Sequence, residues 1–237
     1  MATVSLDGDP RLAPLLARAA LTARGRGGTL PDTVVQRADV VVDVARLAAY
    51  QRVCGYLVRD TLPSTYLHVL TFGLQATLMA ERRFPLPLPG LVHVAQTLVA
   101  HRAVDAGERL SLRVRAERLR AHPRGAQVDL VASASVGEER VWQGTSTYLA
   151  RGASAPADVA DTPSDIASEA ASEAAADVPE VGTDGPPTAR WRVPADAGRR
   201  YAAVSGDVNP IHLAAPTARL LGFNLPERVL ERAGLNA

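Results

Sequence analysis

Residues 66–82 have the sequence Y-L-H-V-L-T-F-G-L-Q-A-T-L-M-A-E-R, and this run decides how the middle of the chain folds. Apolar residues lie on almost every side of a helix built from it, which is typical of a buried helix rather than a surface one. The T-L-P-S sequence of residues 61–64 provides an entry to the helix, and three prolines at positions 85, 87 and 89 close it off. The pattern predicts one long buried helix that other elements must cover.

Runs with strand character lie on both sides of this helix in the sequence. The run 109–120 shows the pattern most clearly, because Leu110, Leu112 and Val114 alternate with polar residues. Turns at 122–125 and 137–139 separate the last three runs. The expected strands are 34–44, 91–103, 109–120, 126–136 and 140–151, and a second helix is expected at 45–57. An antiparallel sheet wrapped around one long helix is an α+β fold of the hot-dog architecture.

Composition divides the chain into four parts. Residues 1–30 are expected to form an N-terminal extension with a short helical pattern at 10–24, and residues 31–151 the hot-dog domain. The segment 152–189 is rich in Ala, Ser and Pro and carries eight acidic residues and no basic one. Such a segment buries too little apolar surface to offset its ordering entropy, so a disordered linker is expected there. Residues 190–237 form the last part.

The overall composition favours a cytoplasmic enzyme without identifying its reaction. Hydrophobic residues make up 47% of the 237 residues, and the net charge is only +1, so no strong field indicates a nucleic-acid or membrane partner. The single cysteine, Cys54, excludes an internal disulfide and fits a reducing compartment, and its apolar surroundings predict a buried, inert thiol. No apolar run reaches the roughly 18 residues of a membrane span, and no signal pattern opens the chain.

The last part contains a stretch whose side chains could take part in catalysis, residues 201–212, Y-A-A-V-S-G-D-V-N-P-I-H. Gly206 and the pair Asn209-Pro210 disfavour a regular helix, so the backbone should curl. A curled segment can direct Asp207 and His212, five positions apart, toward one point, where a carboxylate and an imidazole could transfer protons. The plainer alternative is ordinary turn chemistry followed by a chance histidine.

Together with the following A-P-T-A-R-L-L-G-F, which ends at Phe223, this stretch resembles the hydratase motif of the MaoC-like dehydratases. These are the (R)-specific enoyl-thioester hydratases of the hot-dog fold. The resemblance implies that Asp207 and His212 are the catalytic pair, which adds or removes water across the double bond of a trans-2-enoyl thioester of coenzyme A or acyl carrier protein. It also implies that Asn209 holds the catalytic loop, with Ser205 and Gly206 supporting it.

The earlier part of the chain resembles the N-terminal half of the double-hot-dog members of this family. The position that corresponds to the motif falls near residues 50–59, Y-Q-R-V-C-G-Y-L-V-R, which lack a G-D pair and a paired histidine. The resemblance implies a non-catalytic half that shapes the pocket for the acyl chain and pantetheine. The histidines at 68, 93, 101 and 122 are expected to be structural. Neither metal-ligand spacing nor a phosphate-binding glycine loop is present, so no metal or cofactor is expected.

The sequence departs from the family after Phe223, where residues 224–228 read N-L-P-E-R. Family members continue there to a His-Gly pair that opens a second long helix and supplies an oxyanion donor. A truncated second hot-dog half with impaired activity is therefore expected. Three functions stay open: a hydratase or dehydratase of fatty-acid metabolism, a non-catalytic subunit that pairs with another hot-dog chain, or an inactive remnant. A homodimer or a hot-dog partner subunit is the expected assembly.

Overall fold

The computed structural model describes residues 2–21, 25–88, 90–155, 194 and 196–206. The chain separates into two compact units, Met1–Ser164 and Asp165–Ala237. The catalytic pair that the motif predicts, Asp207 and His212, lies outside the described residues, as does Asn209. Each unit is therefore described by itself.

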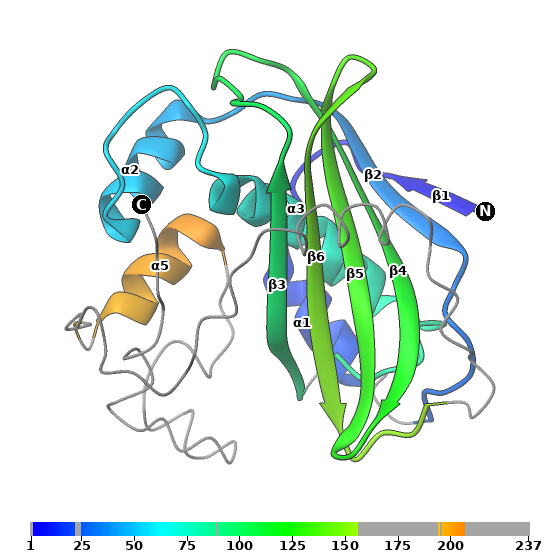
Figure 1. The fold of residues 1–237 in the computed structure, drawn as a ribbon. Coiled ribbons are helices and arrows are strands. Elements are labelled where there is room, and N and C mark those ends of the chain that lie inside the picture. Colours follow the sequence, from blue (N-terminus) through cyan, green and yellow to red (C-terminus); the bar gives the residue numbers. More distant parts are fainter. Residues whose placement is uncertain (1, 22–24, 89, 156–193, 195, 207–237) are drawn as a thin grey trace, which may run out of the picture. The chain divides into compact units, whose positions relative to one another are not determined.

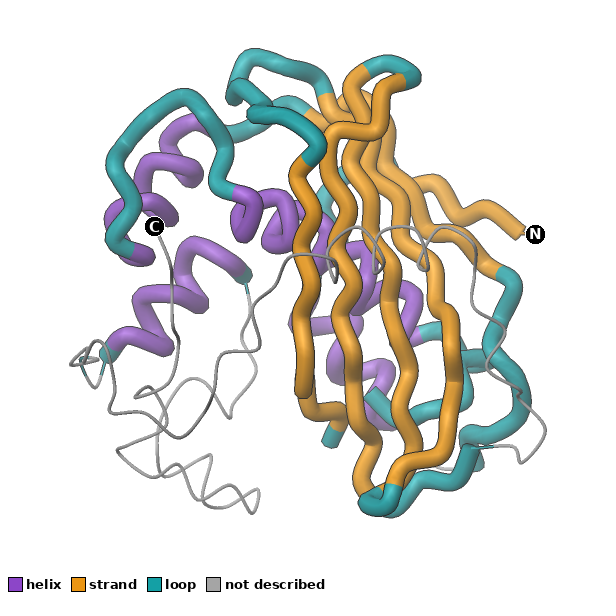
Figure 2. The backbone as a smooth tube through the Cα atoms, in the orientation of Figure 1, coloured by secondary structure: helices purple, strands orange, loops and turns teal. Residues whose placement is uncertain are grey.

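The first unit is a six-stranded sheet with the long helix α3 packed across one face (Figures 1 and 2). The strand order in the sheet is β1-β2-β4-β5-β6-β3. The strands are β1 Ala2–Ser5, β2 Thr33–Val40, β3 Leu91–Ala100, β4 Leu110–His122, β5 Gly125–Val136 and β6 Glu139–Arg151. The helices of this unit are α1 Leu12–Leu21, α2 Val44–Cys54 and α3 Ser64–Ala80. The long helix and the five expected strands are confirmed, with shifts of a few residues at their ends.

The N-terminal residues contribute to the sheet, which the sequence did not predict. Strand β1 pairs in parallel with β2, so the sheet is mixed rather than purely antiparallel. Helix α1 packs against α3, and Pro10 just before it lies so close to Gly73 of α3 that a Cβ there would stand 2.8 Å from the Pro10 Cγ atom. The glycine therefore permits the close approach, and residues 2–21 belong to the fold of the first unit.

The core lies between α3 and the sheet. Leu74 and Leu78 of α3 and Leu112 and Leu130 of the sheet are fully buried, each contributing roughly 1.5–3 kcal/mol by leaving water. The carbonyl groups at the end of α3 are bound by the side chain of Arg26. Its guanidinium donates hydrogen bonds to the carbonyl oxygens of the last two residues of α3, Met79 at 2.9 Å and Ala80 at 3.4 Å, and to that of Leu86 in the following loop at 3.3 Å. This side chain satisfies acceptors that a helix end leaves open.

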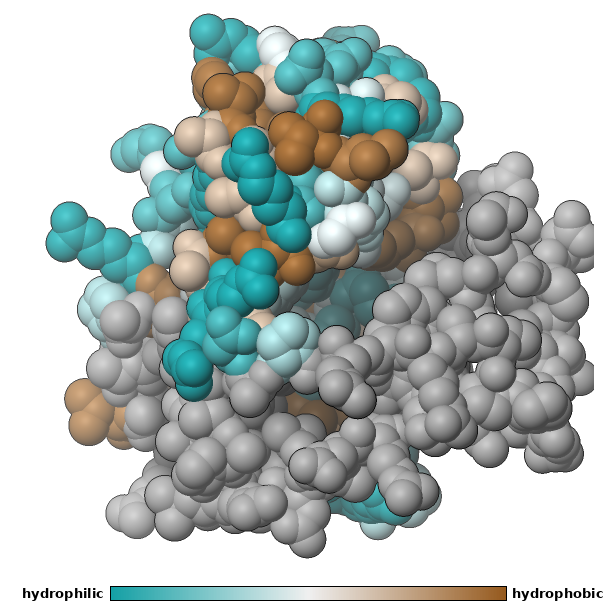
Figure 3. All heavy atoms as spheres, turned by 90° about the vertical axis from the view of Figure 1, so that its left-hand side faces the viewer, coloured by the Kyte–Doolittle hydropathy of each residue, from teal (hydrophilic) through white to brown (hydrophobic). Residues whose placement is uncertain are grey.

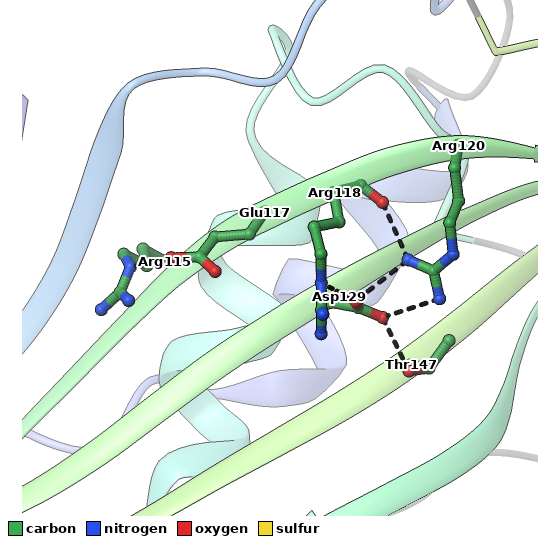
Figure 4. Close-up of polar contacts among 6 residues, drawn as sticks. All are labelled: Arg115, Glu117, Arg118, Arg120, Asp129 and Thr147. Carbon is green, nitrogen blue, oxygen red and sulfur yellow. Dashed lines mark hydrogen bonds and ion pairs between the residues drawn. The ribbon is translucent and has the colours of Figure 1, made fainter. Parts of the chain in front are cut away.

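A bulge in β4 is fixed by a buried carboxylate, Asp129 of β5 (Figure 4). The β4–β5 register shifts between Glu117 and Arg120, and Arg118 between them has a φ of 50°. Asp129 is 1% exposed and binds Arg118 Nε at 2.6 Å and Arg120 Nη1 at 3.0 Å, while Thr147 donates to it at 2.6 Å. A buried charge is tolerated only with such partners, so the cluster specifies where the strand bends.

The face near α2 exposes several apolar side chains (Figure 3). Cys54, expected to be buried, is exposed: it follows the buried Tyr50 and Gln51 by one turn, but it is the last residue of α2 and the residues after it, 55–60, are themselves exposed. Apolar side chains at both ends of the helix are exposed as well: Val41, Val44, Tyr56, Leu57 and Val58. Among the described residues, no helix combines the length and the apolar character that a membrane crossing requires.

Candidate active site

The hydratase motif begins at Tyr201, within helix α5, Ala197–Ser205, and this helix ends at Gly206. The expected curl therefore does not begin at Tyr201, since that residue is still helical. Gly206 has φ 79° and ψ 1°, a left-handed conformation that glycine adopts without strain, and its N–H donates to the Ala202 carbonyl at 2.9 Å. Ser205 is buried, and its hydroxyl donates to the Tyr201 carbonyl at 2.8 Å.

This geometry determines where the predicted catalytic loop starts. Asp207 follows directly after the helix cap Gly206, so the first member of the pair is one residue from a fixed backbone turn. Ser205 supports the helix end through its hydrogen bond to the Tyr201 carbonyl. The roles of Asp207, Asn209 and His212 remain predictions, as do the expectations for the residues after Phe223, because these residues are not described.

The first unit contains a helix end of the same kind. Asp43 caps the start of α2 by accepting from the backbone N–H groups of Ala45 and Arg46, at 2.9 and 3.0 Å. Helix α2 ends at Gly55, with φ 77° and ψ 14°, whose N–H donates to the Gln51 carbonyl. Aligned on their glycines, α2 and α5 also share a tyrosine five positions earlier, and Tyr56 and Thr61 occupy the positions of Asp207 and His212.

The loop after Gly55 is held by a buried amide. Gln51 is 1% exposed, and its Nε2 donates to the carbonyls of Arg59 at 2.9 Å and Thr61 at 3.4 Å. Its Oε1 accepts from the Arg59 N–H at 3.2 Å. Tyr56 stacks on Tyr50 at 6.3 Å between ring centroids. The loop is therefore anchored, but its chemistry at the two matching positions is that of hydroxyl groups rather than an acid–base pair.

A group of polar side chains that includes two histidines lies between α3 and the edge of the sheet. His93 of β3 stacks between His68 of α3, at 5.9 Å, and Tyr148 of β6, at 4.9 Å. Tyr148 donates to Gln75 Oε1 at 3.3 Å, and Gln75 Nε2 donates to Thr71 Oγ1 at 3.2 Å. Burial, with a smaller contribution from His93, lowers the pKa of His68 to about 4. We call these five residues the edge cluster.

The sequence did not predict the edge cluster, because His68 and His93 were each expected to be structural. A signal was present, because His68, Thr71 and Gln75 are spaced by three and four residues and so share one face of the helix. The other two histidines do not join it. His101 lies beyond the end of β3, and His122 accepts the Arg124 N–H at 3.1 Å. In the described part of the chain, no three His, Cys, Asp or Glu side chains are grouped to hold a metal ion.

Comparison with known proteins places this architecture in a family. No family model matches the chain. It is 33% identical over 207 residues to 3-hydroxyacyl-thioester dehydratase X of Mycobacterium tuberculosis, a match that covers 87% of this chain and 69% of the relative. The crystal structure of HtdX of Mycobacterium tuberculosis superposes with a TM-score of 0.62 at 32% identity, covering 80% of this chain and 68% of that one. A structure named MaoC-like dehydratase has the same fold, with a TM-score of 0.56 at 15% identity over 84% of this chain and 72% of that chain.

The fold and the motif thus define the class, a hot-dog protein with a hydratase motif. The identity to the mycobacterial dehydratase then shows the family: the chain belongs to the 3-hydroxyacyl-thioester dehydratases of the MaoC-like family. The match covers 87% of the chain, so it must extend beyond the acidic segment. The sequence similarity therefore includes both units.

Proposed function

We propose that this chain is a lyase that interconverts (3R)-hydroxyacyl and trans-2-enoyl thioesters by removing or adding water. The observation that carries the proposal is the ungapped motif from Tyr201 to Phe223, in a chain 33% identical to a 3-hydroxyacyl-thioester dehydratase. The substrate is an acyl thioester of coenzyme A or acyl carrier protein in fatty-acid metabolism, and the reaction takes place in the cytoplasm.

In the hydration direction, His212 accepts a proton from the attacking water, since a neutral imidazole can act as a base near neutral pH. Asp207 accepts a hydrogen bond from the other O–H group of the same water and orients it, and that hydrogen stays on the new C3 hydroxyl. The water oxygen bonds to C3 as the C2–C3 double bond opens, and the abstracted proton is returned to C2. Charge that develops on the thioester oxygen requires hydrogen-bond donors, such as backbone N–H groups.

The helix end at Gly206 supports this assignment of roles. Its left-handed cap ends α5 immediately before Asp207, so the predicted catalytic loop begins directly after a regular element. In our proposal Asn209 holds the loop that brings His212 back toward the same water. Catalytic groups must be held closely, because a displacement of about 1 Å can reduce the rate about a hundredfold.

The test is to incubate the purified full chain with a trans-2-enoyl-CoA and to identify the product by mass spectrometry and chiral chromatography. We expect a (3R)-hydroxyacyl-CoA, formed faster than in buffer or with an Asp207→Asn variant. An Asp207→Asn protein that is as active as the wild type would refute the proposed site. Product of the 3S configuration would refute the proposed stereochemistry.

A second role, assembly with another hot-dog chain or a second copy, is favoured by strand β3. This strand lies at the end of the strand order and pairs only with β6 among the described strands. Val94, at a register shift in β3, is 44% exposed. Because long edge strands with apolar side chains pair with other chains, we expect a dimer or a complex by sedimentation analysis. The Val94→Lys variant should be more monomeric than the wild type. A wild-type mass equal to one chain would exclude self-pairing.

A further inference from the structure

Helix α2 has a group of exposed apolar side chains at each of its ends. Val41 and Val44 lie at its start, Leu57 and Val58 lie just after its end, and each of the four is more than half exposed. We call these four residues the α2 patch. Single exposed apolar residues are common on proteins, whereas a group of them on one face indicates an interaction site.

The loop that carries the second group is anchored. Buried Gln51 binds both the N–H and the carbonyl of Arg59, as described above. The Tyr56 hydroxyl lies 3.0 Å from Thr65 Oγ1, and its ring stacks on that of Tyr50. Because a loop that is already ordered loses less entropy on binding, Leu57 and Val58 are presented in a form suited to association.

The side of α2 between the two groups is open to a second helix. Val44, Ala48 and Arg52 are spaced by four residues, so they lie along one side of α2. The side chains that α2 buries in the first unit are those of Leu47, Tyr50 and Gln51. Ala48, in the middle of the open side, has only a methyl group, and short side chains permit close packing of two helices. A helix that packs along this side extends toward both apolar groups.

The charges around the α2 patch favour a second copy of the chain as the partner. The exposed charged residues differ between the two ends of α2: Asp39 and Asp43 at the start, and Arg52, Arg59 and Asp60 at the end. Arg46, also near the start, is half-buried and paired with Asp9. An anionic membrane or an acidic protein would meet like charges at the start of the helix. A second α2 that runs in the opposite direction brings its basic end to this acidic end.

We propose that two copies of this chain associate through the α2 patch, with their α2 helices antiparallel across a two-fold axis. Val41 and Val44 of each copy then face Leu57 and Val58 of the other, and the two Ala48 residues meet near the axis. A two-fold interface uses the same surface of both copies, so each apolar and charged match occurs twice. This interface is separate from strand β3, and the inference does not depend on the reaction assigned to the chain.

Disulfide formation across the axis tests this arrangement in the full chain. Cys54 is the only cysteine, six residues from Ala48 along α2. In the antiparallel pair the two Cys54 residues are separated by roughly 18 Å along the helices, whereas a disulfide requires Cα atoms within about 7 Å. A protein with Ala48→Cys and Cys54→Ser should therefore form a covalent dimer under mild oxidation, and the wild type should not. Non-reducing electrophoresis measures the covalent fraction.

Substitutions in the α2 patch should weaken the association itself. Val44→Asp and Leu57→Asp should each raise the dissociation constant about tenfold or more in sedimentation equilibrium, because each places a charge where an apolar side chain leaves water. Val44→Asp should not disrupt the fold, since an acidic residue stabilises the start of a helix. Thermal unfolding of each variant checks this.

Two controls lie outside the α2 patch. Leu21 at the end of α1 is even more exposed than Leu57, and Leu21→Asp should leave the dissociation constant unchanged. Val94→Lys alters the edge strand β3, and adding it to the protein with Ala48→Cys and Cys54→Ser should leave the covalent fraction unchanged. Loss of the covalent dimer on adding Val94→Lys would show that the copies meet through β3 instead, which contradicts the inference.

Three further outcomes would overturn the inference. The first is a wild type that sediments as one chain, or a protein with Ala48→Cys and Cys54→Ser that forms no covalent dimer. The second is binding of a monomeric wild type to vesicles of phosphatidylglycerol and phosphatidylcholine that Leu57→Asp abolishes, which would assign the α2 patch to a membrane surface. The third is a loss of thermal stability in Val44→Asp and Leu57→Asp with unchanged association, which would show that the α2 patch is covered within one chain.

Discussion

Helices α2 and α5 end alike, yet the residues that follow them differ in chemistry. Each ends at a left-handed glycine with nearly the same φ, 77° at Gly55 and 79° at Gly206, and each glycine N–H bonds back to the carbonyl four residues earlier. A tyrosine stands five positions before each glycine. The next residue is Tyr56 in the first case and Asp207 in the second.

The comparison shows that the backbone frame and the chemistry are separable. The frame depends on a helix, a glycine that can adopt positive φ, and a loop that starts there. In the first unit Gln51 anchors that loop, and no acid–base pair occupies the matching positions. A motif search that finds the helix and the glycine would therefore select both units, whereas the residues predicted to transfer protons, Asp207 and His212, follow only the second glycine.

The largest expected effect on turnover comes from substituting the residues that differ between the two helix ends. Asp207→Asn and His212→Ala should each reduce enoyl-thioester hydration at least a hundredfold, the scale of a lost acid or base. Tyr56→Phe and Thr61→Ala, at the matching positions of the first unit, should leave turnover at saturating substrate unchanged. Steady-state kinetics on all four variants checks this. Similar losses in both pairs would show that the first unit takes part in the chemistry.

Substituting the two glycines tests whether the frames have different roles. Gly55→Ala and Gly206→Ala should each destabilise their unit by about 1–2 kcal/mol, because alanine is strained at positive φ. Only Gly206→Ala should also reduce turnover, by about tenfold or more, since it displaces the loop that carries Asp207. Denaturant unfolding and kinetics measure the two effects. Equal turnover of the two variants would contradict the assignment.

Removing the anchor of the first loop should affect stability without affecting chemistry. Gln51→Leu leaves the Arg59 N–H and two carbonyls without their side-chain partner, so the free energy of unfolding should fall by roughly 1–3 kcal/mol. Turnover at saturating substrate should stay within a factor of about two, because this loop bears no catalytic pair. A large fall in turnover in a protein that remains folded would give the loop a direct catalytic role.

The edge cluster predicts an acid-dependent loss of stability. The pKa of His68 is about 4 in the folded chain against an ordinary value of 6.5, so between these values the unfolded state binds more protons. The free energy of unfolding therefore falls as pH drops from 6.5 toward 4, and the contribution is fully present only above 6.5. His68→Asn, which does not titrate, should show a shallower fall in urea unfolding across this range. Identical pH profiles would show that the ring is not shielded from water.

The smallest effect on the stability of the first unit is expected from cleaving the chain between the units. We propose that the segment 152–189 is the linker that its composition predicts, so limited proteolysis should cleave there first. The surviving fragment should include β1 and α1, because both pack into the first unit. Its unfolding midpoint should equal that of the first transition of the intact chain. First cuts within β4 or β5 would contradict this division.

The sequence predicted the elements that have a period or a clear turn. Helix α3 is apolar on all sides, and β4, β5 and β6 are separated by short turns, so their positions follow from local pattern. Strand β1 has only four residues, too few for its alternation to predict a strand, and it is a strand because β2 offers it an edge. Cys54 lies on the same side of α2 as the buried Tyr50 and Gln51, and it is exposed because the helix ends there; what covers a helix end is not specified by local pattern.

The candidate site was less predictable from the residues alone. The spacing of Asp207 and His212 permits proton transfer, but their assignment to thioester hydration depends on family resemblance. The edge cluster joins residues from α3, β3 and β6, and only its helical half has a spacing that the sequence reveals. Contacts between distant strands depend on register, which local patterns do not determine.

The central claim is that the unit with Asp207, rather than the similar frame at Gly55, adds water to the thioester. The most direct measurement is hydration of a trans-2-enoyl-CoA in ¹⁸O-labelled water by the wild type, Asp207→Asn and Tyr56→Phe proteins, followed by mass spectrometry of the product. We predict ¹⁸O in the C3 hydroxyl of a (3R)-hydroxyacyl-CoA with the wild type and Tyr56→Phe, and at least a hundredfold less with Asp207→Asn. Equal labelling with Asp207→Asn and the wild type, or labelling lost only with Tyr56→Phe, would contradict the claim.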